Sequence, residues 1–150
     1  MAIFKYKMQN ILDIKNKLEN QARMQFAAAK ERLNQEEEKL NRLYARKHGY
    51  MEEAVTLRQN KLDTRSLREN RHALAKMEEL IRAQVLQVRL AQKNVENARA
   101  RLTEVMIERK TQEKLKEKAF EEFMMDERAG ESKEIDELTS YTYGQKKNED

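Results

Sequence analysis

The clearest periodicity in this 150-residue chain lies in residues 67–105, which read LRENRHALAKMEELIRAQVLQVRLAQKNVENARARLTEV. Six apolar side chains recur there every seven residues: Leu67, Leu74, Ile81, Val88, Val95 and Leu102. A second series follows each of them by three residues: Asn70, Met77, Gln84, Ala91, Ala98 and Val105. Spacings that alternate between three and four place both series on one stripe of an α-helix, as in the seam of a coiled coil. The stretch therefore predicts a long helix that packs against another helix.

A similar pattern precedes this stretch. Alternating steps of four and three connect Ala22, Phe26, Ala29, Leu33, Glu36, Leu40, Leu43, Lys47, Tyr50, Ala54 and Leu57. A related rhythm lies upstream, in Phe4, Met8, Ile11, Lys15, Leu18 and Ala22. Glu36 and Lys47 interrupt the apolar series, and we expect their charged ends to turn outward while their stems stay in the seam. The first half of the chain therefore predicts a second long helix.

Between the two patterns, residues 60–66 read NKLDTRS and carry no apolar rhythm. Asp63, Thr64 and Ser66 are each suitable N-caps for a new helix. If the chain folds back near Leu62, large residues of one helix face small residues of the other, which close packing requires. We therefore predict an all-α fold, a long antiparallel two-helix coiled-coil hairpin over residues 1–130 with its turn in 60–66.

The last part of the chain differs in composition. Gly130 is a natural helix stop, and mostly polar residues follow it. We expect residues 131–150 to form a flexible tail, with room for a short helix around Ile135.

Composition supports long helices. Charged and hydrophobic residues each make up 39% of the chain, the mean hydropathy is −1.04, and the chain has three glycines and no proline. The absence of cysteine excludes disulfides, thiol nucleophiles and cysteine-ligated zinc. No stretch approaches the ~18 apolar residues of a membrane span, and the N-terminus has no continuous apolar segment of a secretory signal. We therefore expect a cytoplasmic protein.

Catalytic chemistry finds little support in the sequence. His48 and His72 are the only histidines, and the nearby glutamates lack a diagnostic ligand spacing, so we interpret both as surface residues. Carboxylate runs such as 36–38 are typical of a solvated helix face, because a two-helix hairpin has no cleft in which to shift a carboxyl pKa. No glycine-rich phosphate loop occurs. The sequence therefore predicts a protein that is not an enzyme and has no metal, cofactor or small-molecule substrate.

Two features point to binding instead. Lys5, Lys7, Lys15 and Lys17 would meet Lys110, Lys114, Lys116 and Lys118 at the end away from the turn, forming a positively charged end. Such an end suits an acidic protein ring or a phosphate backbone. Nucleic acid is the weaker alternative, because exposed aromatics do not interleave the lysines. Tyr44, Tyr50 and Leu80 lie in or beside the seam and leave apolar surface for a partner.

Several segments carry a family resemblance. They are FKYKMQNILDIK at residues 4–15, KLE at 17–19, QA at 21–22, EEEKLNRL at 36–43, KAFEEF at 118–123 and DE at 126–127. With the polar tail, these segments resemble the flagellar export protein FliJ family over essentially the whole chain. The N-terminal string is the most specific of them.

The resemblance implies a function that periodicity alone does not show. Proteins of this family form an antiparallel two-helix stalk, similar to that of rotary ATPases, whose terminal end enters the pore of a hexameric flagellar export ATPase and promotes its assembly and activity. The implied ATPase-binding residues are Lys5, Lys7, Lys15 and Lys17. A second surface would contact the membrane export gate protein through Leu40, Leu43, Tyr50, Met77 and Leu80. The resemblance also implies export chaperones as partners and a cytoplasmic location, peripheral to the inner face of the cell membrane at the flagellar base.

An alternative function remains open at this point. A generic coiled-coil adaptor or export chaperone would bind helical clients through its apolar edge without affecting ATP hydrolysis.

Overall fold

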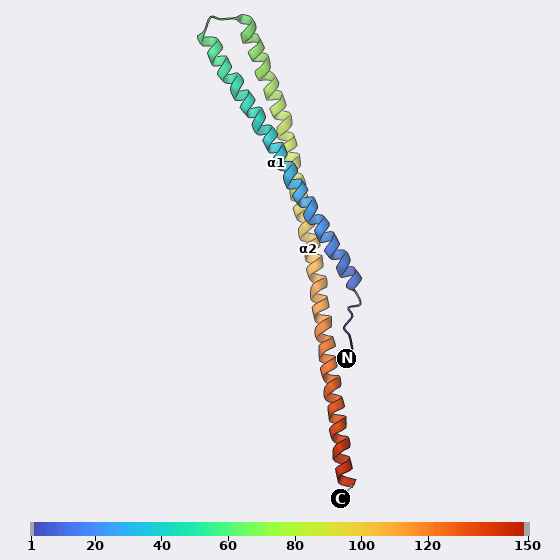
Figure 1. The fold of residues 1–150 in the computed structure, drawn as a ribbon. Helices are drawn as coiled ribbons and strands as arrows, with labels where there is room; N and C mark the ends of the chain where they lie inside the picture. Colours follow the sequence, from blue (N-terminus) through green and yellow to red (C-terminus); the bar gives the residue numbers. More distant parts are fainter. Residues whose placement is uncertain (1, 149–150) are drawn as a thin grey trace. The chain divides into compact units, whose positions relative to one another are not determined.

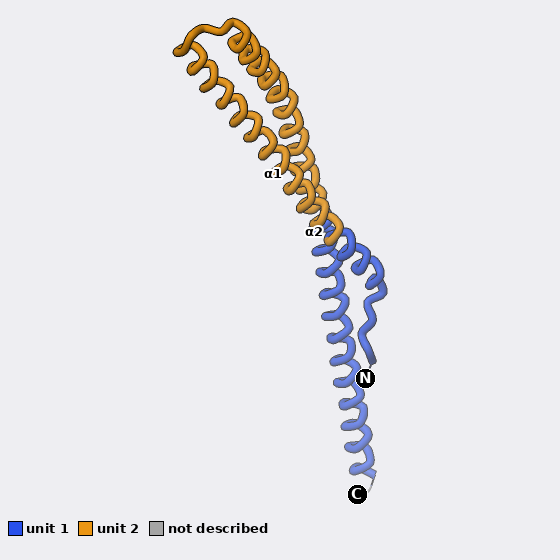
Figure 2. Tube along the Cα trace, turned by 45° about the horizontal axis from the view of Figure 1, so that its top comes forward, with its two compact units in different colours: residues 1–19, 105–150 blue, residues 20–104 orange. Residues whose placement is uncertain are grey.

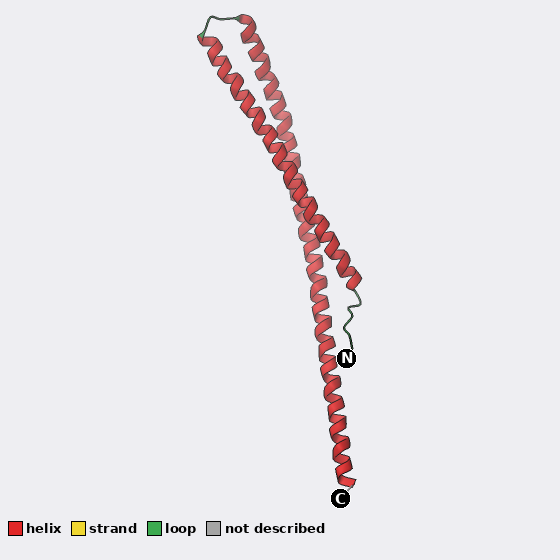
Figure 3. Ribbon diagram, in the orientation of Figure 1, coloured by secondary structure: helices red, strands yellow, loops and turns green. Residues whose placement is uncertain are grey.

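The computed structural model describes residues 2–148. Within them the chain forms two α-helices, α1 (Gln9–Gln59) and α2 (Thr64–Asn148), and no strand. Residues 60–63 connect the helices, which run antiparallel (Figure 1, Figure 3). The all-α helical hairpin that the two seams predicted is therefore confirmed.

Asp63 begins the second helix. Its Oδ1 accepts a hydrogen bond from the backbone N–H of Arg65 at 3.1 Å, and its Oδ2 accepts one from the Ser66 hydroxyl at 2.8 Å. These bonds, with that from Ser66 the stronger, lower the pKa of the Asp63 carboxyl. Of the three residues suited to cap this helix, Asp63 is the one that does so, because its two oxygens reach otherwise unbonded donors of the first turn.

The chain divides into two compact units (Figure 2). Unit 1 comprises residues 1–19 and 105–150, and unit 2 comprises residues 20–104. Each unit holds part of α1 beside part of α2, and each is described by itself below.

Unit 2 is held by the predicted seam. Its apolar seam residues are all buried or half-buried, and the buried ones are Ala22, Ala54, Met77, Ile81, Val88, Ala91 and Val95. Glu36 is the exception to the expected pattern, because its residue is only 3% exposed. The expectation that its charge turns outward is wrong, since partners inside the unit hold the carboxylate in place.

Unit 1 uses a seam that differs from the predicted one by a residue. Leu12 and Glu19 are buried, whereas Met8 and Ile11 are 43% and 37% exposed. Leu12, Lys15, Glu19 and Ala22 continue the alternation of three and four without a break, so the expected rhythm through Met8 and Ile11 is wrong. Apolarity alone could not find this register, because it places a glutamate on the seam.

Two kinds of contact close unit 1. Val105 is fully buried, at 0% exposure. The Phe4 ring lies 5.2 Å from the Phe120 ring, nearly edge-on, and 5.4 Å from the Phe123 ring. Aromatic pairs of this geometry add to the stabilisation from burial. They hold the segment that precedes α1 against α2.

The expected end of the second helix at Gly130 is wrong. Helix α2 continues through Gly130 to Asn148, and no glycine of the described chain has a positive φ. A lone glycine weakens a helix by only about 1 kcal/mol relative to alanine, and no proline follows to stop it. Every residue from 128 to 148 is exposed, so no tertiary packing supports this part of the helix. The flexibility of the tail stays a prediction.

A membrane span is not among the elements of residues 2–148, since neither helix combines the required length with the required apolarity.

Candidate functional site

A partly buried polar cluster lies where the two segments of unit 1 meet. The Glu19 carboxylate is buried and forms an ion pair with the guanidinium of Arg109. The Arg109 guanidinium also donates a hydrogen bond to Glu113 at 2.8 Å, and this bond, together with the one that it donates to Glu19, raises its pKa. This largely buried ion pair favours one register of the two segments, because a shift of one along the other would separate the two charges.

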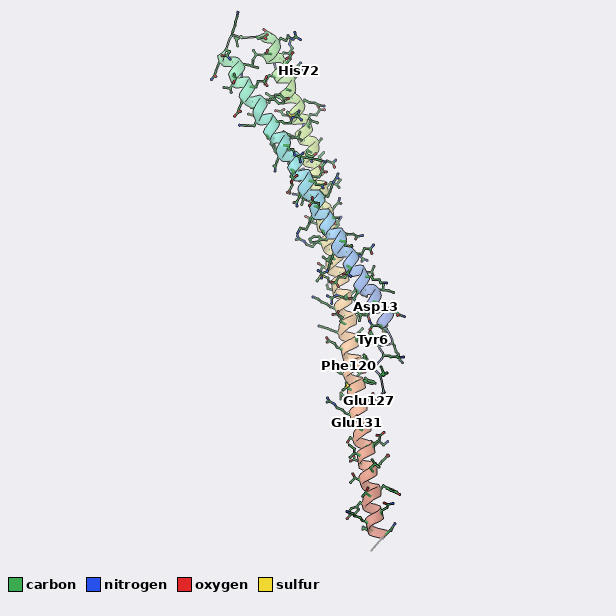
Figure 4. The ribbon with its side chains drawn as sticks, viewed as in Figure 1. Tyr6, Asp13, His72, Phe120, Glu127 and Glu131 are labelled. Carbon is green, nitrogen blue, oxygen red and sulfur yellow. The ribbon has the colours of Figure 1, made fainter. Side chains whose placement is uncertain are left out.

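Heptad analysis missed this pair. Glu19 and Arg109 occupy seam positions. The sequence pattern that could have indicated them is a pair of opposite charges at facing positions of the two seams. Two further contacts lie nearby: Lys15 pairs with Glu108 at 2.9 Å, and the Tyr6 hydroxyl donates to Gln112 at 3.4 Å. Figure 4 shows Tyr6, Asp13 and Phe120 along this part of the unit.

The four lysines expected to bind an acidic ring differ in their surroundings. Lys5, Lys7 and Lys17 are exposed, and none of them forms an ion pair within residues 2–148. Lys15 is half-buried and its ammonium is paired with Glu108. Lys15 therefore serves the contact between the two segments, and three lysines remain available to a partner.

The two units differ in their charge balance. Unit 1 carries 13 Lys and Arg against 15 Asp and Glu, whereas unit 2 carries 18 against 12. Over its whole length unit 1 therefore has two more acidic than basic residues, and the positive end expected from the two lysine clusters stays a prediction. The lysines before residue 19 form a local basic patch in a slightly acidic unit.

A groove opens on unit 1, and a neighbouring hollow that shares Phe4, Gln9 and Lys116 with it is also lined by Lys5. The apolar part of the groove comes from Phe4, Leu12 and Phe120, and its polar rim comes from Gln9, Asn16, Glu113, Lys116 and Glu117. The groove has a volume of about 520 Å³ and is open to solvent. Apolar surface close to Lys5 gives unit 1 both an apolar and a charged contact area for a protein partner.

The residues expected to contact the export gate all lie in unit 2. Leu40, Leu43, Tyr50 and Leu80 are half-buried, so each presents part of its side chain. Met77 is 3% exposed and belongs to the core. Met77 can therefore support a surface there but offers little area to a partner.

Two amide side chains bond to backbone carbonyls across the seam of unit 2. Asn70 donates to the carbonyl oxygen of Tyr50 at 2.9 Å, and Gln84 donates to that of Glu36 at 3.0 Å. Gln84 also donates to the Glu36 carboxylate at 2.5 Å, and Arg32 and Lys39 lie 2.9 and 3.6 Å from it. The Gln84 hydrogen bond, followed by the two cations, lowers the pKa of Glu36 against the opposing effect of desolvation.

The histidines lie on the surface of unit 2. His48 pairs with Glu52 at 3.1 Å, and both side chains are more than two-thirds exposed. Across residues 2–148, no three His, Cys, Asp or Glu side chains gather in a way that could hold a metal ion.

Comparisons with known proteins give two matches. A family model described as "Flagellar FliJ protein" matches residues 4–148. The solved structure of a proposed YscO homologue from Chlamydia trachomatis superimposes with a TM-score of 0.77 at 22% sequence identity, covering 99% of this chain and 100% of that chain. At this identity the likeness shows a shared fold. Comparison with curated proteins gives no match.

Proposed function

Since the chain belongs to the FliJ family of flagellar proteins, we propose that this component of the flagellar type III export machinery acts as the stalk of a hexameric export ATPase. In this proposal unit 1 enters the pore of the ring, promotes its assembly and raises its activity. The family is non-catalytic, so the ATPase supplies hydrolysis and this chain supplies binding.

The observation that carries the proposal is the closure of unit 1. The Phe4 contacts with Phe120 and Phe123 and the buried Glu19–Arg109 pair hold the N-terminal segment against α2. Because of these contacts, Lys5 and Lys7 project from an ordered segment and not from a flexible one. Groups that are already ordered lose less conformational entropy when they bind, so the ordered segment favours binding to a partner that engages this end repeatedly.

The effect on the ATPase follows from linkage. A ligand shifts an equilibrium toward the state that it binds more tightly. If the pore exists only in the assembled ring, a protein that binds the pore stabilises the hexamer over its separate subunits. Lys5, Lys7 and Lys17 would pair with acidic side chains of the pore, and Lys15 would keep the segment in register.

The gate contact is a second part of the proposal. Leu40, Leu43, Tyr50 and Leu80 would form the surface of unit 2 that meets the membrane export gate protein, with Met77 supporting it from the core. Such a contact would place the protein in the cytoplasm at the inner face of the membrane, at the flagellar base.

The direct test is ATP hydrolysis by the export ATPase of the same organism, measured over a range of ATPase concentrations with and without this protein. We expect stimulation to be strongest where the ATPase is poorly assembled, with ring formation rising in parallel. The variant Lys5→Glu/Lys7→Glu/Lys17→Glu should lose most of the stimulation. A matched control, Arg82→Glu/Arg89→Glu/Lys93→Glu, makes the same charge change in unit 2 and should stimulate normally.

One observation favours the adaptor or chaperone alternative. Tyr44, Met51 and Val55 are 48%, 51% and 53% exposed at helical spacing on α1, so they form an apolar stripe outside the seam. An adaptor would capture helical export clients on this stripe. Unchanged hydrolysis and assembly with the folded protein, together with client binding lost in Met51→Ser/Val55→Ser, would favour this function over the stalk.

A further inference from the structure

We propose that the turn of the hairpin is a membrane-surface site, which binds anionic phospholipid headgroups through its cations and inserts Leu62 among the lipids. The turn surface, as we call it, consists of Leu62 and five cationic side chains: Arg58, Lys61, Arg65, Arg68 and Arg71. This inference does not depend on binding to the ATPase.

The turn surface has an excess of positive charge that its own acids do not neutralise. Residues 58–71 hold five Lys and Arg against two acids, Asp63 and Glu69. Asp63 accepts the hydrogen bonds that cap α2, and Glu69 pairs with Arg65 at 3.2 Å. The remaining four cations are exposed and form no ion pair within residues 2–148. Their charge is therefore available to an anionic surface.

The cations lie close enough to the apex to act together. At 1.5 Å per residue, Arg68 is about 6 Å and Arg71 about 10 Å along α2 from its first residue. The Debye length is about 8 Å at physiological ionic strength, and a juxtamembrane cation gains attraction to an anionic leaflet only within such a distance. An end-on approach of the turn thus brings Arg58, Lys61, Arg65 and Arg68 within range at once, and Arg71 lies just beyond it.

Leu62 is the feature that favours a membrane over another polyanion as the partner of the turn surface. It lies in the connection between the helices, outside any regular element, and is 69% exposed. A leucine at the apex of a basic tip gains free energy when it enters the acyl boundary, and cationic and apolar groups side by side are typical of peripheral membrane contacts. On a nucleic acid the leucine would remain in water. Residues 58–71 also contain no aromatic side chain on which bases could stack.

The composition of the chain offers a sensitive test of insertion. The protein contains no tryptophan, so the single tryptophan of Leu62→Trp reports on its own surroundings. We expect its emission to shift to the blue with vesicles of phosphatidylcholine and phosphatidylglycerol, and to stay unchanged with phosphatidylcholine alone. The control Leu86→Trp replaces a leucine of similar exposure, 62%, on α2 and should not shift with either vesicle.

Vesicle co-sedimentation tests the charges in the full chain. Arg58→Glu/Arg68→Glu should weaken binding to the phosphatidylglycerol vesicles about tenfold or more, and added salt should weaken wild-type binding. The control Arg82→Glu/Arg89→Glu makes the same charge change on exposed arginines away from the turn and should bind as the wild type does.

Three results would overturn the proposal. One is equal binding of both kinds of vesicle, which would remove the role of charge. Another is no blue shift at position 62 when the protein is bound. The third is retention of duplex DNA or an acidic protein by the turn arginines without any vesicle binding, which would assign the turn surface to a different class of partner.

Discussion

One amide nitrogen of Gln84 donates to both the carboxylate and the backbone carbonyl oxygen of Glu36, at 2.5 and 3.0 Å, across the seam of unit 2. Two heptads earlier in α2, Asn70 makes the same kind of bond to the carbonyl oxygen of Tyr50. A slip of one helix along the other would leave these buried polar groups without partners. Polar seam positions of this kind therefore specify the register of a coiled coil.

The Glu36 carboxylate should make the stability of the hairpin depend on pH. Its folded-state pKa lies below the ordinary value of 4.5, because Gln84, Lys39 and Arg32 stabilise the charged form. The contribution is therefore complete above the unfolded pKa and is lost as the pH falls through the folded pKa. Between neutral pH and pH below about 4, the melting temperature of the wild type should fall more than that of Glu36→Gln.

Gln84→Ala serves as the companion variant in that experiment, because it removes the largest cause of the lowered pKa while keeping the carboxylate. We expect the transition of Gln84→Ala to occur at a higher pH than that of the wild type. Identical pH profiles for all three proteins would contradict this account of Glu36.

Met77 should matter for stability and Met51 should not. Met77 is 3% exposed, whereas Met51 is 51% exposed. Truncation of a buried methionine leaves a cavity in a packed seam, so Met77→Ala should lower the free energy of unfolding by about 2–5 kcal/mol. Met51→Ala should change it by less than about 0.5 kcal/mol. Urea unfolding followed by circular dichroism checks both, and equal losses would place Met77 outside the core.

Phe4 should control the order of the N-terminal segment. Phe4→Ala removes both ring contacts, each worth about 0.5–1.5 kcal/mol beyond burial, so residues before α1 should exchange their amide hydrogens faster. The global unfolding midpoint should change little, because the contact lies at one edge of unit 1. Stimulation of the export ATPase should fall with the loss of order, and Phe4→Tyr should retain both properties. Slow exchange in Phe4→Ala would show that other contacts hold the segment.

The C-terminal part of α2 should form a helix that opens easily. Residues 131–148 are exposed throughout, and isolated helices of this length are marginal in water. Their amides should exchange much faster than those of residues 105–123. Removal of residues 131–150 should lower the helical circular dichroism signal and leave the unfolding midpoint of the hairpin unchanged. A lower unfolding midpoint after truncation would show that the removed residues pack against the rest of the hairpin, which would contradict this prediction.

Sequence reasoning located the seam of unit 2 because repeated apolar spacing reports burial directly. Of the residues that it misplaced, Glu36 and Glu19 carry charge and Gly130 lacks a side chain. Met8 and Ile11 were misplaced because a buried glutamate continues the true seam. Glu36 and Glu19 are buried because Gln84 and Arg109 satisfy them from the other helix, which a pattern within one helix cannot show. Gly130 stays helical because one unfavourable residue costs less than the helix formers around it contribute.

The candidate binding surfaces were less accessible to prediction. Periodicity identifies which residues face the partner helix, but it does not say which exposed residues meet another protein. Lys15 illustrates the difference, since only the structure shows that Glu108 occupies its charge. The assignment to export came from the resemblance of residues 4–15 and others to a family, and the family match over residues 4–148 confirms it.

The stalk proposal is tested most directly by finding which end of the hairpin lies in the ATPase ring. The chain has no cysteine, so a photo-crosslinker can be attached at a single position in Lys7→Cys or in Gln59→Cys. With the assembled export ATPase, we predict efficient cross-linking to the ring from position 7 and none from position 59. Cross-linking from position 59 alone, or from neither position while the protein stimulates hydrolysis, would contradict the proposal that unit 1 enters the ring.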